Sequence, residues 1–142
     1  MADSVVLDSS LIAALFFKDP HSDLAEEALQ EFKTYHTLDL AFAEVGNVAW
    51  KRVYLFNEEY NITAQALEKA ADFIASICQV APSRDYLKEA FDVGVKEGLT
   101  VYDSLFISQA KRLKTTLLTV DSELHRKAEA SKNLRGTVSS PK

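Results

Sequence analysis

The chain has 142 residues, 47% of them hydrophobic, which is enough to bury the core of one globular domain, and we expect residues 1–142 to form a single one. Its 16 basic and 21 acidic residues give a formal net charge of −5, which excludes nucleic-acid binding through overall positive charge. One cysteine excludes an internal disulfide, and no apolar stretch has bilayer length, so we expect a soluble, cytoplasmic protein without membrane contact.

The first half of the chain alternates extended and helical patterns. Val5-Val6-Leu7 predicts a short buried strand that ends at Asp8, and the apolar run over residues 11–17 predicts a helix just after it. Extended segments are expected over residues 34–40 and 78–81. Further helices are expected over residues 23–32, 41–56 and 64–77, the last of them capped by Thr63.

The second half continues the alternation. A helix is predicted over residues 84–97 and stops at Gly98. Residues 99–102 form an apolar, partly β-branched run like a strand, and helical spacing resumes after Asp103. A strand over residues 115–120 ends at Asp121, and a helix over 122–130 and a strand near 137–138 follow. This order predicts an α/β fold, a three-layer α/β/α arrangement around a mostly parallel sheet.

Acidic residues follow several of these extended segments. Asp8, Asp103 and Asp121 each come after a predicted strand, and Glu44 follows a fourth extended segment. Functional groups in parallel sheets gather beyond the carboxyl ends of the strands, so the four side chains are expected to converge. Each also has a purely structural interpretation. The aspartates could cap helices, and Glu44 could be a solvated acid in the first turn of its helix.

If the four acids converge, their mutual repulsion requires a cation. Oxygen ligands without histidine or cysteine favour Mg²⁺ or Mn²⁺ over Zn²⁺. Such ions lower the pKa of water and stabilise a leaving oxygen, which suits hydrolysis of phosphodiester bonds.

Four ordered motifs carry a resemblance that spans residues 5–124. They are V-V-L-D-S-S-L-I-A-A-L, A-E-V-G-N-V-A-W-K, L-T-V-Y-D-S-L-F-I-S-Q-A and L-L-T-V-D-S-E-L. Together they resemble the motifs of PIN-domain ribonucleases, and the compact chain is similar to the VapC-type toxins of toxin–antitoxin pairs. The resemblance implies Mg²⁺- or Mn²⁺-dependent cleavage of RNA, frequent homodimers, and inhibition by a small antitoxin protein.

The resemblance also implies roles for individual residues. The metal-binding acids of the family fall on Asp8, Glu44, Asp103 and Asp121. The small polar residue of the first motif falls on Ser10, and a threonine of the last motif falls on Thr119.

Two further side chains share a predicted helix face with Glu44. Asn47 could orient a metal-bound water or be a polar edge residue, and Lys51 could meet a substrate phosphate or be a solvated charge. Phe16, Phe17 and the apolar helix around residues 42–56 could form a homodimer face or an antitoxin groove, or pack in the core. Trp50 and Tyr102 are expected in the core.

Two other functions stay open on the sequence alone. The first is a non-catalytic scaffold in which the acids are helix caps and a protein partner binds. The second is a receiver-like phosphoacceptor domain, which would require paired acids after the first strand, where this chain has only Asp8.

Overall fold

The computed structural model describes residues 3–141. The strands of this part of the chain are β1 (Ser4–Leu7), β2 (Thr34–Leu38), β3 (Gln79–Ala81), β4 (Leu117–Leu118) and β5 (Val138–Ser139). The helices are α1 (Ser9–Phe16), α2 (Ser22–Leu29), α3 (Leu40–Tyr54), α4 (Tyr60–Ser76), the 3₁₀-helix η1 (Ser83–Tyr86), α5 (Leu87–Glu97), α6 (Val101–Arg112) and α7 (Ser122–Ala130).

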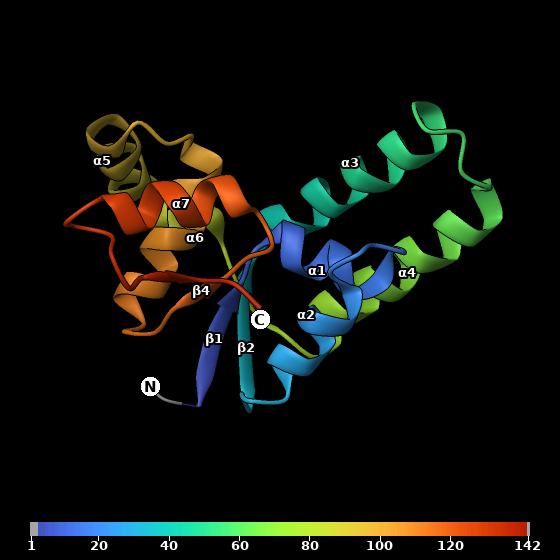
Figure 1. Cartoon of the computed structure of the whole chain (residues 1–142), viewed down its shortest axis with the longest axis horizontal. Coiled ribbons are helices and arrows are strands. Elements are labelled where there is room, and N and C mark those ends of the chain that lie inside the picture. The colour runs from blue at the N-terminus through green and yellow to red at the C-terminus, as the bar shows by residue number, and fades with distance from the viewer. Residues whose placement is uncertain (1–2, 142) are drawn as a thin grey trace.

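The strands form one sheet in the order β3-β2-β1-β4-β5, and every pairing is parallel. β1 lies at the centre and pairs with β2 on one side and β4 on the other. Parallel neighbours need a crossover connection, and the helices supply it on both faces of the sheet (Figure 1). The predicted α/β fold with its parallel sheet is therefore confirmed.

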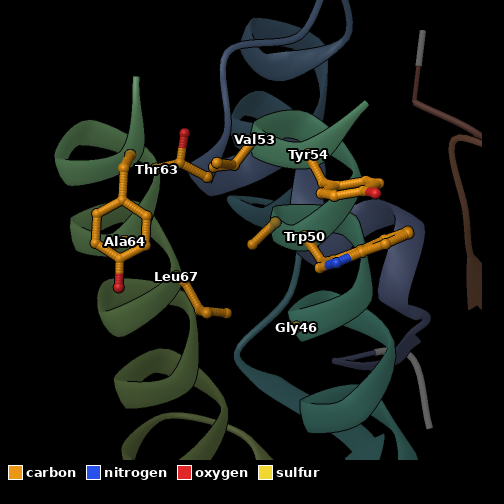
Figure 2. Close-up of a pocket in the computed structure, with 9 residues that line it drawn as sticks. Gly46, Trp50, Val53, Tyr54, Thr63, Ala64 and Leu67 are labelled. Atoms are coloured by element: carbon orange, nitrogen blue, oxygen red, sulfur yellow. The ribbon is translucent and has the colours of Figure 1, made fainter. Parts of the chain in front are cut away.

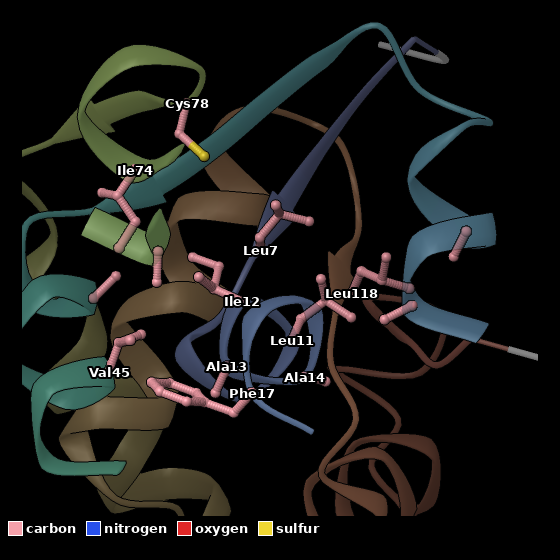
Figure 3. Packing of buried hydrophobic residues seen from close by; sticks show 14 of the residues in the cluster. Leu7, Leu11, Ile12, Ala13, Ala14, Phe17, Val45, Ile74, Cys78 and Leu118 are labelled. Atoms are coloured by element: carbon pink, nitrogen blue, oxygen red, sulfur yellow. The ribbon is translucent and has the colours of Figure 1, made fainter. Parts of the chain in front are cut away.

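The central strand divides the core between the two faces. Val5 and Leu7 pack with α1–α4, whereas Val6 points to the opposite face and packs with α5–α7. Figure 3 shows Leu7 and Leu118 meeting Leu11 and Ile12 of α1 in the first of these clusters. All four residues of β1 are buried, as expected for a strand covered by helices on both sides.

Helix α4 and helix α6 begin differently from the sequence prediction. α4 begins at Tyr60 with Glu59 as its cap, so Thr63 lies inside the helix and does not cap it. Residues 99–102 form no strand: Thr100 caps α6, and its hydroxyl accepts a hydrogen bond from the backbone N–H of Asp103. Asp103 therefore lies in the first turn of a helix and does not follow a strand. The predicted helix end at Gly98 is confirmed, since this residue has a φ of 71°.

Several aromatic side chains expected in the core are exposed. Trp50 and Tyr102 keep 51% and 59% of their surface accessible, so the prediction for both was wrong. Phe17 is buried and the Phe16 ring lies 5.4 Å from that of Phe73, so this pair belongs to the core and to no exposed surface. Within residues 3–141, no helix is both long and apolar enough to cross a membrane.

Candidate active site

The carboxyl end of β1 delivers Asp8 to the start of α1. Asp8 caps this helix, and its Oδ1 accepts hydrogen bonds from the Leu11 backbone N–H at 2.9 Å and from the Ser10 hydroxyl at 2.7 Å. The carboxylate is nearly fully buried. Burial raises the pKa of Asp8 to about 6, against the lowering effect of hydrogen bonds from Thr119, Leu11 and Ser10.

The neighbouring strand β4 brings the second part of the site. The Ser10 hydroxyl lies 3.0 Å from that of Thr119 and accepts a hydrogen bond from the Val120 N–H. Thr119 is completely buried, and its hydroxyl accepts from the Asp121 N–H at 3.0 Å. Asp121 itself is exposed and caps α7. Ser10 and Thr119 thus join the segments that carry Asp8 and Asp121.

Helix α3, which follows β2, supplies Glu44. This half-buried residue lies beyond the first turn, contrary to the interpretation of it as a solvated first-turn acid. Its Oε1 accepts a hydrogen bond of 2.6 Å from the Ser9 hydroxyl at the start of α1. Burial raises the pKa of Glu44, the Ser9 bond lowers it, and the charge of Asp103 raises it.

The fourth acid, Asp103, enters from the opposite layer on α6. Since Thr100 caps this helix, Asp103 has no capping role. Burial raises the pKa of Asp103, and the negative charge of Asp121 raises it further; Thr100 and the positive charge of Lys127 act in the opposite direction. The charge of Asp103 in turn raises the pKa of both Asp8 and Glu44. The negative charge of Asp103 therefore interacts unfavourably with the charge of each of the other three acids.

The charges of the four acids interact, but the acids do not form a closed metal-binding cluster. Within residues 3–141, no group of three or more His, Cys, Asp or Glu side chains is arranged so that it could hold a metal ion. The four side chains offer only oxygen atoms as donors, the ligand type that Mg²⁺ and Mn²⁺ prefer.

Asn47 and Lys51 occupy the more open part of the same helix. Both are exposed on α3, one and two turns beyond Glu44, and in the described part of the chain no hydrogen bond or ion pair joins either of them to the acids. Their roles stay predictions.

Sequence reasoning missed Ser9, Thr100 and Lys127. Ser9 bonds a residue 35 positions away, which no local pattern reveals. Thr100 precedes Asp103 by three residues, and this cap spacing could have located the helix start. The positive charge of Lys127 on α7 lowers the pKa of Asp103 across the site, and this effect is visible only in three dimensions.

Comparisons with known proteins agree with this geometry. The PIN domain family matches residues 5–130. Ribonuclease VapC3 from Pyrobaculum aerophilum is 35% identical over 126 residues, which cover 89% of this chain and 95% of that relative.

Two crystal structures share the fold. PAE2754 from Pyrobaculum aerophilum has a TM-score of 0.69 and 28% identity, over 97% of this chain and 84% of that one. VapBC2 from Rickettsia felis, bound to a DNA fragment from its promoter, has a TM-score of 0.63 and 18% identity, over 98% of this chain and 99% of that one. At 18% identity the second likeness shows the fold alone.

Proposed function

This chain belongs to the PIN-domain family, and on that premise we propose that it is a metal-dependent endoribonuclease that acts as the toxin of a toxin–antitoxin pair. The observation that carries the proposal is that Ser9, Ser10 and Thr119 join the segments of Asp8, Glu44 and Asp121 by hydrogen bonds. The negative charge of Asp103, from a fourth element, raises the pKa of both Asp8 and Glu44 in agreement with this geometry. The relative that is 35% identical is named a ribonuclease, which supports RNA as the substrate.

The residues of the site fit Mg²⁺ or Mn²⁺. Asp8, Glu44, Asp103 and Asp121 would hold the ion, directly or through its bound waters, and the ion when bound would activate a water as a Lewis acid and stabilise the leaving oxygen. Ser10 and Thr119 hold Asp8 and Asp121 in register through hydrogen bonds, and Ser9 orients Glu44. Asn47 and Lys51 lie on the α3 face that an RNA strand would pass, where Lys51 would meet a phosphate.

An apolar groove between α3 and α4 supports an antitoxin partner. It has a volume of about 340 Å³, and Figure 2 shows Trp50 and Tyr54 of α3 and Leu67 of α4 around it. The Trp50 and Tyr54 rings stack with centroids 5.1 Å apart and remain exposed. Exposed apolar surface of this kind is typical of a site that takes the apolar face of a partner helix.

A separate stripe on α5 supports a homodimer. Leu87, Phe91 and Val95 follow one another at four-residue spacing and are 52%, 55% and 71% exposed. Residues at this spacing share one helix face, which a second copy of the chain can cover.

The test is cleavage of single-stranded RNA by the purified protein with Mn²⁺, Mg²⁺ or EDTA. We expect cutting that requires the metal and that Asp103→Asn abolishes, with a fall in rate of at least about a hundredfold. The fold should persist, because Asp103 caps no helix. Asp92→Asn is the matched control: this exposed acid on α5 pairs with Lys88, and its loss should leave the rate unchanged.

Two outcomes would contradict the proposal. Full activity of Asp103→Asn would remove this residue from the site. Absence of cutting by the native protein, together with absence of Mn²⁺ binding in calorimetry, would favour the non-catalytic scaffold. Asp8 and Asp121 do cap helices in this fold, so the scaffold accounts for two of the four acids.

A further inference from the structure

A chain of buried hydrogen bonds runs underneath the acidic site. The Thr37 hydroxyl on β2 donates to the Leu7 carbonyl of β1 at 2.8 Å, and the Gln109 side-chain amide on α6 donates to the Thr37 carbonyl at 2.9 Å. Thr37 and Gln109 are 0% and 1% exposed. Three elements that come from distant parts of the chain are thereby tied together at one point.

The point lies where the central strand ends its pairing with β2, while Leu7 is still paired with Leu118 of β4. Backbone pairing of β1 with β2 runs as far as Val6 and His36, and Leu7 is the next residue. Its carbonyl is held by the Thr37 hydroxyl, and the following residue is Asp8. The Thr37 bond therefore fixes the peptide unit that carries Asp8 out of the strand.

The same chain of bonds reaches the segments of two more acids. β2, which contains Thr37, leads directly into α3 with Glu44, and α6 carries both Gln109 and Asp103. The Gln109 amide joins α6 to β2 on the face of the sheet that α6 covers. Asp8, Glu44 and Asp103 are thus all held relative to one buried threonine.

Packing alone does not account for the Gln109 amide. Its helix neighbours Phe106, Ile107 and Ala110 are buried apolar residues, and its own Oε1 has no hydrogen-bond partner in the described part of the chain. A half-satisfied buried amide is less favourable for stability than an apolar side chain of the same shape. What the amide contributes is a directed bond from α6 to β2.

We propose that Thr37 and Gln109 are positioning residues, which set the spacing of Asp8, Glu44 and Asp103 through the Leu7 carbonyl and the Thr37 carbonyl. The inference rests on the proposed nuclease function. Neither residue touches substrate or metal; both act through the backbone units that carry the acids.

The test compares two threonines that bond the two ends of the same strand. Thr37→Val and Gln109→Met remove the bonds while keeping side-chain volume, and Thr37→Ser keeps the hydroxyl. Thr115→Val is the matched control, because the Thr115 hydroxyl donates to the Ser4 carbonyl at the opposite end of β1, away from the acids. Melting temperature, Mn²⁺ affinity by calorimetry and kcat on RNA are measured for each protein.

We expect Thr37→Val and Gln109→Met to lose about tenfold or more in kcat and in Mn²⁺ affinity, since small misplacements of catalytic groups have effects of this size. Thr115→Val removes a partly buried hydroxyl bond, so it should lower the melting temperature while leaving kcat and Mn²⁺ affinity unchanged. Thr37→Ser, which keeps the hydroxyl, should have the kcat and the Mn²⁺ affinity of the native protein.

Three results would overturn the inference: native kcat and Mn²⁺ affinity in Thr37→Val, equal losses in Thr115→Val, or no rescue by Thr37→Ser. Failure of the proposed function is distinguishable, because the native protein would then bind Mn²⁺ without cutting RNA or would bind none. If the native protein binds Mn²⁺ without cutting RNA, the Mn²⁺ affinities of the variants still test whether Thr37 and Gln109 position the acids. If it binds no Mn²⁺, both proposals are wrong.

Discussion

Asp8 combines a structural and a proposed chemical role in one carboxylate. It caps α1, and it is the most deeply buried of the four acids. The hydrogen bonds of the cap favour the charged form of the carboxyl group, whereas burial disfavours the charged form. Burial has the larger effect, so the pKa of Asp8 is raised. The charged form of Asp8 is therefore unfavourable in the folded protein, and a bound cation would stabilise it.

This balance predicts a pH-dependent stability in EDTA. Folding raises the pKa of Asp8 from 3.8 to about 6, so its stabilising contribution is fully present below pH 3.8 and is lost as pH rises through about 6. Between those values the free energy of unfolding should fall by up to roughly 3 kcal/mol from this group. Urea unfolding of the native protein and of Asp8→Asn across pH 4 to 7.5 measures the effect.

The variant removes the titration of Asp8 together with its interaction with the charge of Asp103, and it leaves groups that do not interact with Asp8 unchanged. Burial lowers the pKa of His36, which acts in the opposite direction over the same pH range but is present in both proteins. Asparagine caps a helix about as well as aspartate, so the cap is retained. A stability difference between the two proteins that does not change with pH would contradict the assignment.

Single residues of the site differ in how well the sequence reveals them. Asp8, Ser10, Thr119 and Asp121 lie beside strand ends, so local patterns and motif resemblance locate them. Thr37 and Gln109 carry no such signal, because their bonds join residues 30 and 72 positions apart. Buried polar contacts of this kind depend on the strand order, which periodicity does not encode.

At the scale of elements, α5 and α6 pack closely where α6 positions Asp103. Gly94 of α5 makes this approach possible: a Cβ there would lie 2.8 Å from the Leu99 carbonyl oxygen and 3.3 Å from the Ser104 Oγ. Backbone cannot move as easily as a flexible side chain. The connection between α5 and α6 at Leu99 would have to move to admit even one methyl group.

Gly94→Ala should therefore destabilise the protein by roughly 1–3 kcal/mol through overpacking. Gly46→Ala is the comparison, because Gly46 lies inside α3 with nothing within 4 Å of the added Cβ. Alanine there should stabilise the protein by up to about 1 kcal/mol. Chemical denaturation measures the free energy of unfolding of both variants. Changes of equal size and the same sign would refute the packing argument.

The alternation of strands and helices was predictable from apolar periodicity, but two elements were not. Residues 99–102 resemble a strand because a short apolar run fits a strand or a buried helix equally well. β4 has only Leu117 and Leu118 in place of the predicted run over 115–120, since its neighbours limit the length of its pairing. The apolar pattern of the sequence shows neither where α6 begins nor how far β4 can pair with its neighbours.

At the scale of the whole molecule, helical periodicity could not tell which apolar faces lack a partner. Trp50 on α3 and Phe91 on α5 follow the same spacing as core residues, yet both are exposed. Whether a helix face is covered depends on where the other helices lie. These faces provide the surfaces for the proposed antitoxin and the proposed second copy.

The homodimer has a direct test. Phe91→Glu places a charge in the centre of the α5 stripe and should convert a dimer to a monomer in light scattering. Lys88→Asp, on the same helix but outside the stripe, should leave the mass unchanged. A native protein that is monomeric at micromolar concentration would exclude the homodimer, and a dimeric Phe91→Glu would exclude this face.

The central place of β1 has a consequence for the synthesis of the protein. Residues 4–7 are made early, but one edge of this strand pairs with residues 117–118, and Ser10 meets Thr119 across 109 positions of sequence. A growing chain on the ribosome therefore lacks β4, Thr119 and Asp121 until most of the domain has been translated. The proposed nuclease site can thus form only after nearly the whole domain has been made.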